Sequence, residues 1–173
     1  MIIGKTIALR PLDRRHSERT RGWANDPRLA QFLDRAWPVG DAEHEEWFSS
    51  LSKNKDHLYL AIETLESEKH VGNIWLWGID WRHRKAELRI VIGETDCGRG
   101  IGSEAIGLLC SHGFERLNLH KIYAYVLGAN PRARCAFEKA GFSIEGTLKE
   151  DRWVGDCYSD VYLLANIANP PKD

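Results

Sequence analysis

The chain has 173 residues, enough for one domain with a sizeable hydrophobic core. Its 24 basic and 25 acidic residues give a formal net charge of -1, which does not favour a nucleic-acid or membrane surface. No apolar run approaches the length of a signal sequence or a membrane span, so we expect a cytoplasmic protein.

The first half of the sequence alternates between strand-like and helix-like segments. Asn25-Asp26-Pro27 is a combination that ends one helix and caps the next, and Asp41 is expected to cap a third helix. The segment 71–79 is apolar on both of its alternating faces, which indicates a central strand covered from both sides. We expect strands at residues 6–12, 57–63 and 71–79, helices at 14–24, 27–33 and 41–53, and a loop at 37–40.

The second half continues this alternation. Along residues 85–92, Ala86, Leu88 and Ile90 share one face of a strand, while Glu87 and Arg89 share the other. We expect a helix from about 101 to 115, a strand at 121–128, a helix capped by Asn130 and ended by Gly141, and a hairpin made of residues 142–153 and 157–164.

A glycine-rich segment stands where the strand ending at Ile92 gives way to a helix. Gly98, Gly100 and Gly102 let main-chain N–H groups approach a ligand closely, and the helix N-terminus adds unpaired N–H groups and a positive dipole end. This combination is typical of a phosphate-binding turn. The segment has neither the G-x-G-x-x-G spacing of a dinucleotide fold nor the lysine of a P-loop. A flexible turn before a helix is the alternative reading.

The four cysteines are far apart and show no spacing typical of a zinc site, so we expect reduced thiols and no metal. Cys97 lies in the glycine-rich segment. The other three, Cys110, Cys135 and Cys157, are expected to be buried.

The order of elements around the glycine-rich segment resembles that of the GNAT superfamily of acyl-CoA N-acyltransferases. Cys97–Gly102 stands where that superfamily has Q/R-x-x-G-x-G/A, and Ser103-Glu104-Ala105 resembles its usual helix start. Other segments resemble the branch that contains ribosomal-protein-alanine N-acetyltransferases, namely Arg10–Leu12, Trp23–Pro27, Leu117–Ile122, Asn130–Ala133 and Glu138–Phe142.

The resemblance implies one α/β (α+β) domain over residues 1–168, followed by a loose tail at 169–173. Its sheet would be mixed and mostly antiparallel, with about seven strands that splay between the fourth and the fifth, and with helices on both faces. Assembly as a homodimer is compatible with this family.

The resemblance also implies acetyl-CoA as co-substrate. Its pyrophosphate would lie on the N–H groups of Gly98–Ser103, and its pantetheine arm would run beside the strand Ile90–Ile92. Asn130 would reach the pantetheine end, with Arg134 or Phe137 alongside. The expected cofactor-binding residues are Ile90, Val91, Ile92, Cys97, Gly98, Arg99, Gly100, Ile101, Gly102, Ser103, Asn130, Arg134 and Phe137.

An amine attacks a thioester only in its neutral form, which for an alkyl amine is roughly one part in 10³ at pH 7. A proton acceptor is therefore required, and Glu87 is the candidate, although a carboxylate paired with Arg89 is an equal reading. His120 is a rival candidate for the base, but the resemblance to the family implies a structural role for it at the start of a strand. The family's usual general acids, a tyrosine and a serine, are replaced by Phe137 and Ala133.

The acceptor side is less defined by motifs. Trp75 and Trp77 share a face and are candidate walls of the acceptor groove, although packing under a helix would explain them equally well. Tyr158, as a second catalytic candidate, and Asp160 could enter the same site from the last strand. The acidic run from Asp41 to Glu46 could attract a cationic amine, but a solvated helix face is the simpler reading.

Three functions compete. The first is an acetyl-CoA-dependent N-acetyltransferase in which a primary amine attacks directly in a ternary complex. Its acceptor would be either a protein or peptide α-amine or a small molecule such as an amino sugar, polyamine or aminoglycoside. The second is an acetyl-CoA-binding module without turnover, which the missing acids favour. The third, a nucleotide-binding regulator, is disfavoured by the absent nucleotide motifs.

Overall fold

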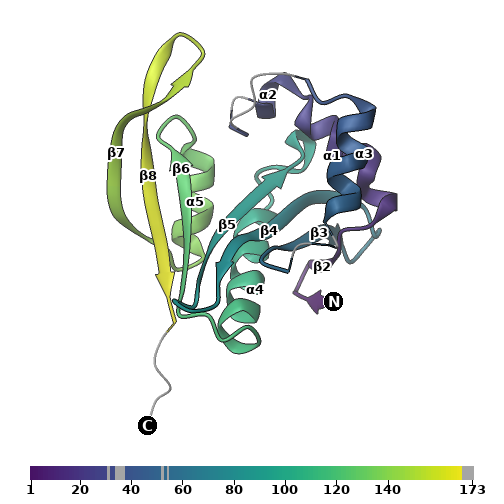
Figure 1. Ribbon diagram of the computed structural model, residues 1–173, viewed down its shortest axis with the longest axis horizontal. Helices are drawn as coiled ribbons and strands as arrows, with labels where there is room; N and C mark the ends of the chain where they lie inside the picture. The colour runs from purple at the N-terminus through teal and green to yellow at the C-terminus, as the bar shows by residue number, and fades with distance from the viewer. Residues whose placement is uncertain (31, 34–37, 52, 54, 169–173) are drawn as a thin grey trace.

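A computed structural model describes residues 1–30, 32–33, 38–51, 53 and 55–168. Eight strands form one open sheet in the order β1-β2-β3-β4-β5-β6-β8-β7 (Figure 1). The strands are β1 (Ile2–Ile3), β2 (Ile7–Pro11), β3 (Leu58–Thr64), β4 (His70–Asp80), β5 (Lys85–Ile92), β6 (Lys121–Leu127), β7 (Ser143–Val154) and β8 (Cys157–Ile167). The α-helices are α1 (Ser17–Ala24), α2 (Pro27–Ala30), α3 (Asp41–Ser50), α4 (Ile101–Glu115) and α5 (Pro131–Lys139), with 3-10 turns η1 (Arg14–His16) and η2 (Glu94–Asp96).

One strand pair breaks the antiparallel pattern of the sheet. β5 and β6 are parallel, and their register runs only from Lys85 opposite Lys121 to Glu87 opposite Tyr123. Beyond Glu87 the two strands diverge, while β5 stays paired with β4 as far as Ile92 (Figure 1). The expected mixed, splayed sheet is therefore confirmed.

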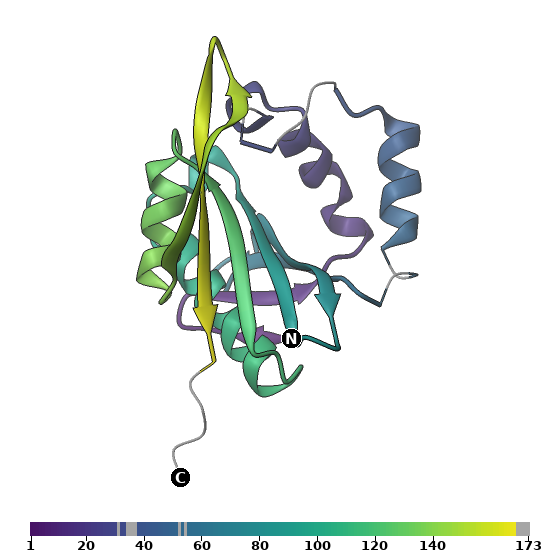
Figure 2. The same cartoon turned by 60° about the vertical axis from the view of Figure 1, so that its left-hand side comes forward.

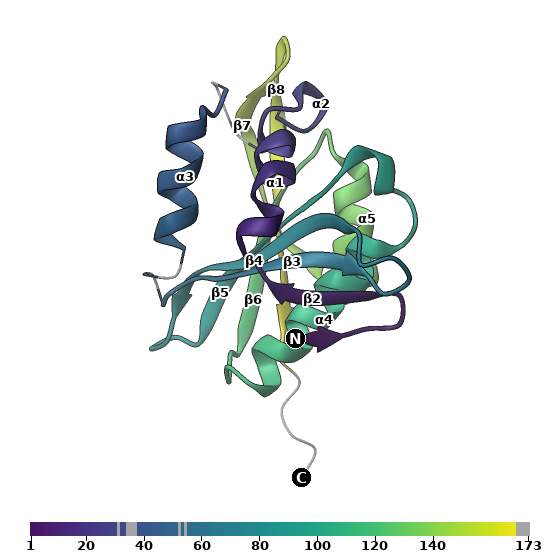
Figure 3. The same cartoon turned by 90° about the vertical axis from the view of Figure 1, so that its right-hand side faces the viewer.

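The helices lie in two layers. α4 and α5 cover one face of the sheet, and α1 and α3 stand over the other face of β3, β4 and β5 (Figures 2 and 3). This arrangement confirms the expectation of helices on both faces. It leaves α3 standing away from the sheet, with a cavity beneath it.

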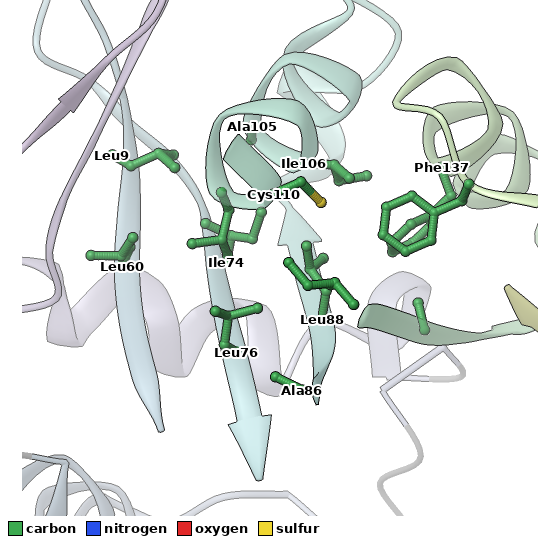
Figure 4. Packing of buried hydrophobic residues seen from close by; sticks show 14 of the residues in the cluster. Leu9, Leu60, Ile74, Leu76, Ala86, Leu88, Ala105, Ile106, Cys110 and Phe137 are labelled. Atoms are coloured by element: carbon green, nitrogen blue, oxygen red, sulfur yellow. The ribbon is translucent and has the colours of Figure 1, made fainter. Parts of the chain in front are cut away.

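The core lies between the sheet and the α4–α5 layer. Alternate residues of the central strands, such as Ile74 and Leu88, point toward Ala105 and Ile106 on α4 (Figure 4). Phe137 of α5 closes this core on the β6 side and meets Phe142 edge to face at 5.0 Å between ring centroids. The alternation places the opposite set of β4 and β5 side chains under α1 and α3.

Several expectations need correction. The sheet has an eighth strand, β1, because Ile2 and Ile3 pair with Leu9 and Ala8. Gly40 rather than Asp41 is the N-cap of α3. Asp41 is already the first residue of the helix, and its carboxylate forms an ion pair with Arg21.

Two of the three cysteines expected to be buried are exposed. Cys135 on α5 and Cys157, the first residue of β8 after the hairpin turn, are exposed, whereas Cys110 is buried on α4.

Four expectations include residues outside the described ones: Gln31 in the helix expected at 27–33, Trp37 in the loop at 37–40, Ser52 in the helix expected at 41–53, and the whole tail at 169–173. Among the described residues, no helix has both the length and the apolar character needed to cross a membrane.

Candidate functional site

The segment Gly98–Gly102, called the glycine turn below, has the conformation of an anion-binding turn. Gly98 and Gly100 have φ values of +83° and +79°, a region that other L residues rarely adopt. Gly100 is the N-cap of α4, so the N–H groups of Ile101, Gly102 and Ser103 have no intrahelical acceptor. The first main-chain bond onto this helix joins Glu104 N–H to Gly100 O at 3.1 Å.

The space around the glycine turn is open. A Cβ built on Gly98 or Gly100 would meet no atom within 4 Å. At Gly102 it would meet only the Cβ of Ala136, at the ordinary distance of 3.7 Å. Unpaired N–H groups beside open space fit a pyrophosphate.

A strip of unpaired main chain leads away from the glycine turn. Ile90, Val91 and Ile92 pair with β4 on one side, whereas their register with β6 has already ended at Glu87. Half of the N–H and C=O groups of this stretch therefore face the opening between β5 and β6. Such a strand edge can bind an extended chain that carries amide groups.

A cavity of about 370 Å³ lies on the other side of β5, between the sheet and helices α1 and α3. We call it the aromatic cavity, because Trp47, Tyr59, Trp75 and Trp77 line it, together with Glu43, His44, Asn73, Arg89 and Val91. The ring of Trp47 meets Tyr59 edge to face, and Tyr59 stacks on Trp75 at 6.1 Å.

Val91 connects the two features. Its side chain lines the aromatic cavity, and its main chain belongs to the unpaired strip of β5. A group held by the strip and a molecule held in the cavity would therefore meet at Val91.

Glu87 lies on the cavity face of β5, and its side chain is 12% exposed. Both of its oxygens accept hydrogen bonds from Arg89, from Nε at 2.7 Å and from Nη2 at 2.9 Å. The Arg89 guanidinium lies 4.9 Å above the Trp77 ring, which in turn stacks on His57 at 3.9 Å. The expected pairing with Arg89 is thus present, and a carboxylate is fixed close to the cavity wall.

Burial raises the pKa of Tyr59, with the charge of Arg89 opposing the shift. The phenol therefore stays neutral near pH 7 and can donate a hydrogen bond in the cavity. Nothing in the sequence marked Tyr59 as a site residue.

The two candidates from the last strand lie elsewhere. Tyr158 is 62% exposed near the tip of the β7–β8 hairpin and packs against Trp153. Asp160 accepts hydrogen bonds from Lys149 Nζ at 2.7 Å and from Glu150 N–H at 3.0 Å. Neither Tyr158 nor Asp160 is among the described residues that line the aromatic cavity.

Some expected cofactor residues have their side chains engaged within the fold. Asn130 Oδ1 caps α5 by accepting from Ala133 N–H, and Arg134 pairs with Glu138 and lies over Tyr162. Ile101 and Phe137 are buried in the core. Ile101 could reach a ligand only through its main chain, and Phe137 only through its main chain or the edge of its ring.

The cavity residues that the sequence did not indicate are mainly Tyr59, Asn73, Trp47 and His44. They come from three separate elements, so no local motif brings them together. Asn73 was the one detectable signal, because it is a polar residue in an otherwise apolar strand face. Within the part of the chain that the structure describes, no group of three or more His, Cys, Asp or Glu side chains is placed to hold a metal ion.

Comparisons with known proteins point to one family. A family model described as an acetyltransferase (GNAT) domain matches residues 6–143. Spermidine N(1)-acetyltransferase of Vibrio cholerae is 37% identical over 97 residues, which are 54% of this chain and 56% of that protein. The probable N-acetyltransferase YjcK of Bacillus subtilis is 29% identical over 182 aligned residues, which cover 100% of this chain and 99% of the relative.

A solved structure agrees with these matches. The crystal structure of spermidine N-acetyltransferase from Vibrio cholerae in complex with CoA and spermine has a TM-score of 0.87. The alignment covers 94% of this chain and 95% of that one, at 27% sequence identity.

Proposed function

This chain belongs to the GNAT family of acetyltransferases and is an N-acetyltransferase, and we propose that it acetylates a small cationic amine bound in the aromatic cavity. Acetyl-CoA is the co-substrate, and the amine attacks it directly in a ternary complex. The observation that carries this proposal is Val91, which borders both the cavity and the unpaired strip of β5.

The co-substrate is proposed to lie along β5. The N–H groups of the glycine turn receive its pyrophosphate, and the strip Ile90–Ile92 binds the pantetheine amides through main-chain atoms. A main-chain N–H near Val91 or Ile92 then polarises the thioester carbonyl. The CoA-bound Vibrio cholerae relative, which has the same fold, supports this placement.

The walls of the cavity favour a cationic acceptor with more than one amine. Aromatic faces attract ammonium groups, and Trp23 lines this cavity together with Trp47, Tyr59, Trp75 and Trp77. The Glu43 carboxylate at its lining adds an acidic group. A polyamine is therefore the first candidate, with one amine at Val91 and a second, charged amine among the rings. The Vibrio cholerae relatives are named for spermidine.

Glu87 is the proposed proton acceptor, directly or through a water molecule. Its place on the cavity face of β5 puts it on the acceptor's side of the sheet, and Arg89 fixes its orientation. Because both oxygens already accept from Arg89, transfer through a water is the simpler route. The thiolate of CoA is a good leaving group, so the absence of a hydroxyl at Phe137 and Ala133 does not prevent turnover.

The proposal is tested by measuring thiol release from acetyl-CoA with a matched panel of amines. Spermidine is expected to exceed a monoamine of similar length by about 2- to 30-fold in kcat/KM, because the second ammonium gains a cation–π contact. A short peptide with a free α-amine and an amino sugar test the other acceptor classes. If CoA binds but none of these amines releases thiol, the proposed small cationic acceptor is wrong.

A further inference from the structure

A buried carboxylate lies just before the glycine turn. Asp96 ends η2, and its side chain is 3% exposed. Its oxygens lie 2.8 and 3.1 Å from Lys69 Nζ, which reaches across from the turn between β3 and β4. Thr95 Oγ1 donates to the same carboxylate at 3.1 Å.

The main chain leading to Asp96 is also held. Gly93 N–H donates to Val71 O at 2.9 Å, and Asp96 N–H donates to Gly93 O at 2.9 Å. Gly93 lies under the Trp23 indole, since a Cβ added there would come within 2.8 Å of Trp23 Nε1. Two residues after Asp96, by contrast, the open space over Gly98 begins. The chain is fixed upstream and open on the side of the proposed ligand.

We propose that Lys69 and Asp96 are positioning residues for CoA. Their ion pair fixes the position of the glycine turn relative to the sheet. The pair would make the N–H groups of Gly98–Ser103 converge on one pyrophosphate. This inference rests on the proposed placement of CoA at the glycine turn. Neither side chain is assigned a contact with CoA.

The charge state of Asp96 supports this role. Burial alone would raise the pKa of Asp96, but the Lys69 ammonium and the Thr95 hydroxyl outweigh it and hold the pKa below its ordinary value. The carboxylate is therefore ionised and depends on Lys69 for compensation. Without Lys69, a charge would remain buried, which is strongly unfavourable. Because Asp96 lies in a turn, the simplest relief is an outward movement that hydrates the carboxylate and displaces Gly98.

The two partners are not equivalent, and this gives a directional test. Lys69 is 42% exposed and stays hydrated if the pair is broken, whereas Asp96, at 3%, reaches water only if the turn itself moves. Lys69→Met is therefore expected to weaken CoA binding by about tenfold in calorimetric titration. Asp96→Asn should weaken it less. The double variant Lys69→Met/Asp96→Asn, which carries no buried charge, should recover most of the affinity, and so should Lys69→Arg.

Steady-state kinetics distinguish positioning from general damage. In Lys69→Met the KM for acetyl-CoA should rise, while kcat and the KM for the amine stay within about twofold of wild type. The control is Lys121→Met, which breaks the Lys121–Glu145 pair at the start of β6 and should leave CoA affinity unchanged. Gly100→Val alters the glycine turn itself and should weaken CoA binding.

Each outcome has a separate meaning. Normal CoA affinity in Lys69→Met together with weak binding in Gly100→Val would overturn the role of the ion pair alone. Normal affinity in both variants, with folding verified by thermal melts, would overturn the placement of CoA. A double variant as weak as Lys69→Met would also contradict the proposal, because the lost charge balance would not be the cause.

Discussion

The Glu87 carboxylate meets the Arg89 guanidinium with both oxygens, while the guanidinium itself rests on the Trp77 ring. This chain of contacts removes rotational freedom from all three side chains. As the proposed proton acceptor, Glu87 would not have to be reoriented when the amine arrives, which would favour catalysis. The arrangement also explains why Arg89 is part of the cavity lining without being a candidate base.

Glu87→Gln should lower kcat by about 10²–10³, because an amide cannot accept the amine proton. CoA affinity should hardly change, since this side chain faces the acceptor rather than the glycine turn. Steady-state rates with acceptors of different amine pKa separate the enzyme's titration from the substrate's. Glu145→Gln, at the Lys121 pair, is the matched control. Near-normal kcat in Glu87→Gln at pH 7 would exclude Glu87 as the base.

For single residues, the sequence predicted which face of a strand a side chain occupies better than it predicted which residue that side chain contacts. The alternation of residues 85–92 correctly placed Glu87 and Arg89 on one side of the strand. It could not predict the pair of Lys69 and Asp96, because these residues are 27 positions apart. Equally, no local signal showed that Glu104 would accept hydrogen bonds from Thr6, 98 positions earlier. Such pairs depend on how the elements pack.

Among the elements, the glycine turn contains two kinds of glycine. Gly100 needs its backbone conformation, since its φ is +79°. Gly102 is inside the first turn of α4 with ordinary room for a Cβ. The sequence pattern treats the two alike, but only Gly100 has a backbone conformation that requires glycine.

Gly100→Ala should lower the free energy of unfolding by about 1 kcal/mol, because an L residue is strained at that φ. Gly102→Ala should not lower it, and the higher helix propensity of alanine could raise it by up to about 1 kcal/mol. Urea unfolding curves measure both changes. Equal destabilisation by the two substitutions would contradict this distinction.

Most elements were predictable because their signals are local. Asn130 and Pro131 start α5, and Gly141, with a φ of +91°, follows its end, as capping rules require. The sequence did not indicate β1, because a strand of two residues is too short to show an alternating pattern. The aromatic cavity was only partly foreseen, since Trp75 and Trp77 share a strand face whereas Trp47 and Tyr59 arrive from other elements.

For the whole molecule, one buried histidine, His70, couples stability to pH. His70 is 7% exposed, donates from Nε2 to Asn73 Oδ1 at 2.8 Å and packs between the rings of His16 and Trp23. Burial lowers the pKa of His70 to about 4. The folded protein therefore keeps this imidazole neutral, whereas the unfolded chain protonates it near its ordinary pKa.

Between pH 6.5 and about 4, His70 is protonated in the unfolded state but neutral in the folded state. Stability from this site is thus present above pH 6.5 and lost as the pH falls toward 4, by about 3 kcal/mol in total. His70→Gln, which keeps a donor for Asn73, should flatten this part of the curve. Urea unfolding at several pH values measures the difference from wild type. Identical slopes in the two proteins would rule out His70 as the cause.

The splay between β5 and β6 has a consequence for how such a protein can change over evolution. In the proposed complex, the co-substrate is recognised by main-chain atoms of Ile90–Ile92 and the glycine turn, which are indifferent to most side-chain substitutions. The acceptor is recognised by side chains on the opposite side of the same strand, contributed by α1, α3 and β3–β5. Recognition of the co-substrate therefore tolerates most substitutions along Ile90–Ile92, while the acceptor side remains free to vary. New acceptors can be acquired by replacing a wall residue such as Trp47 or Trp77, with the acyl donor retained throughout.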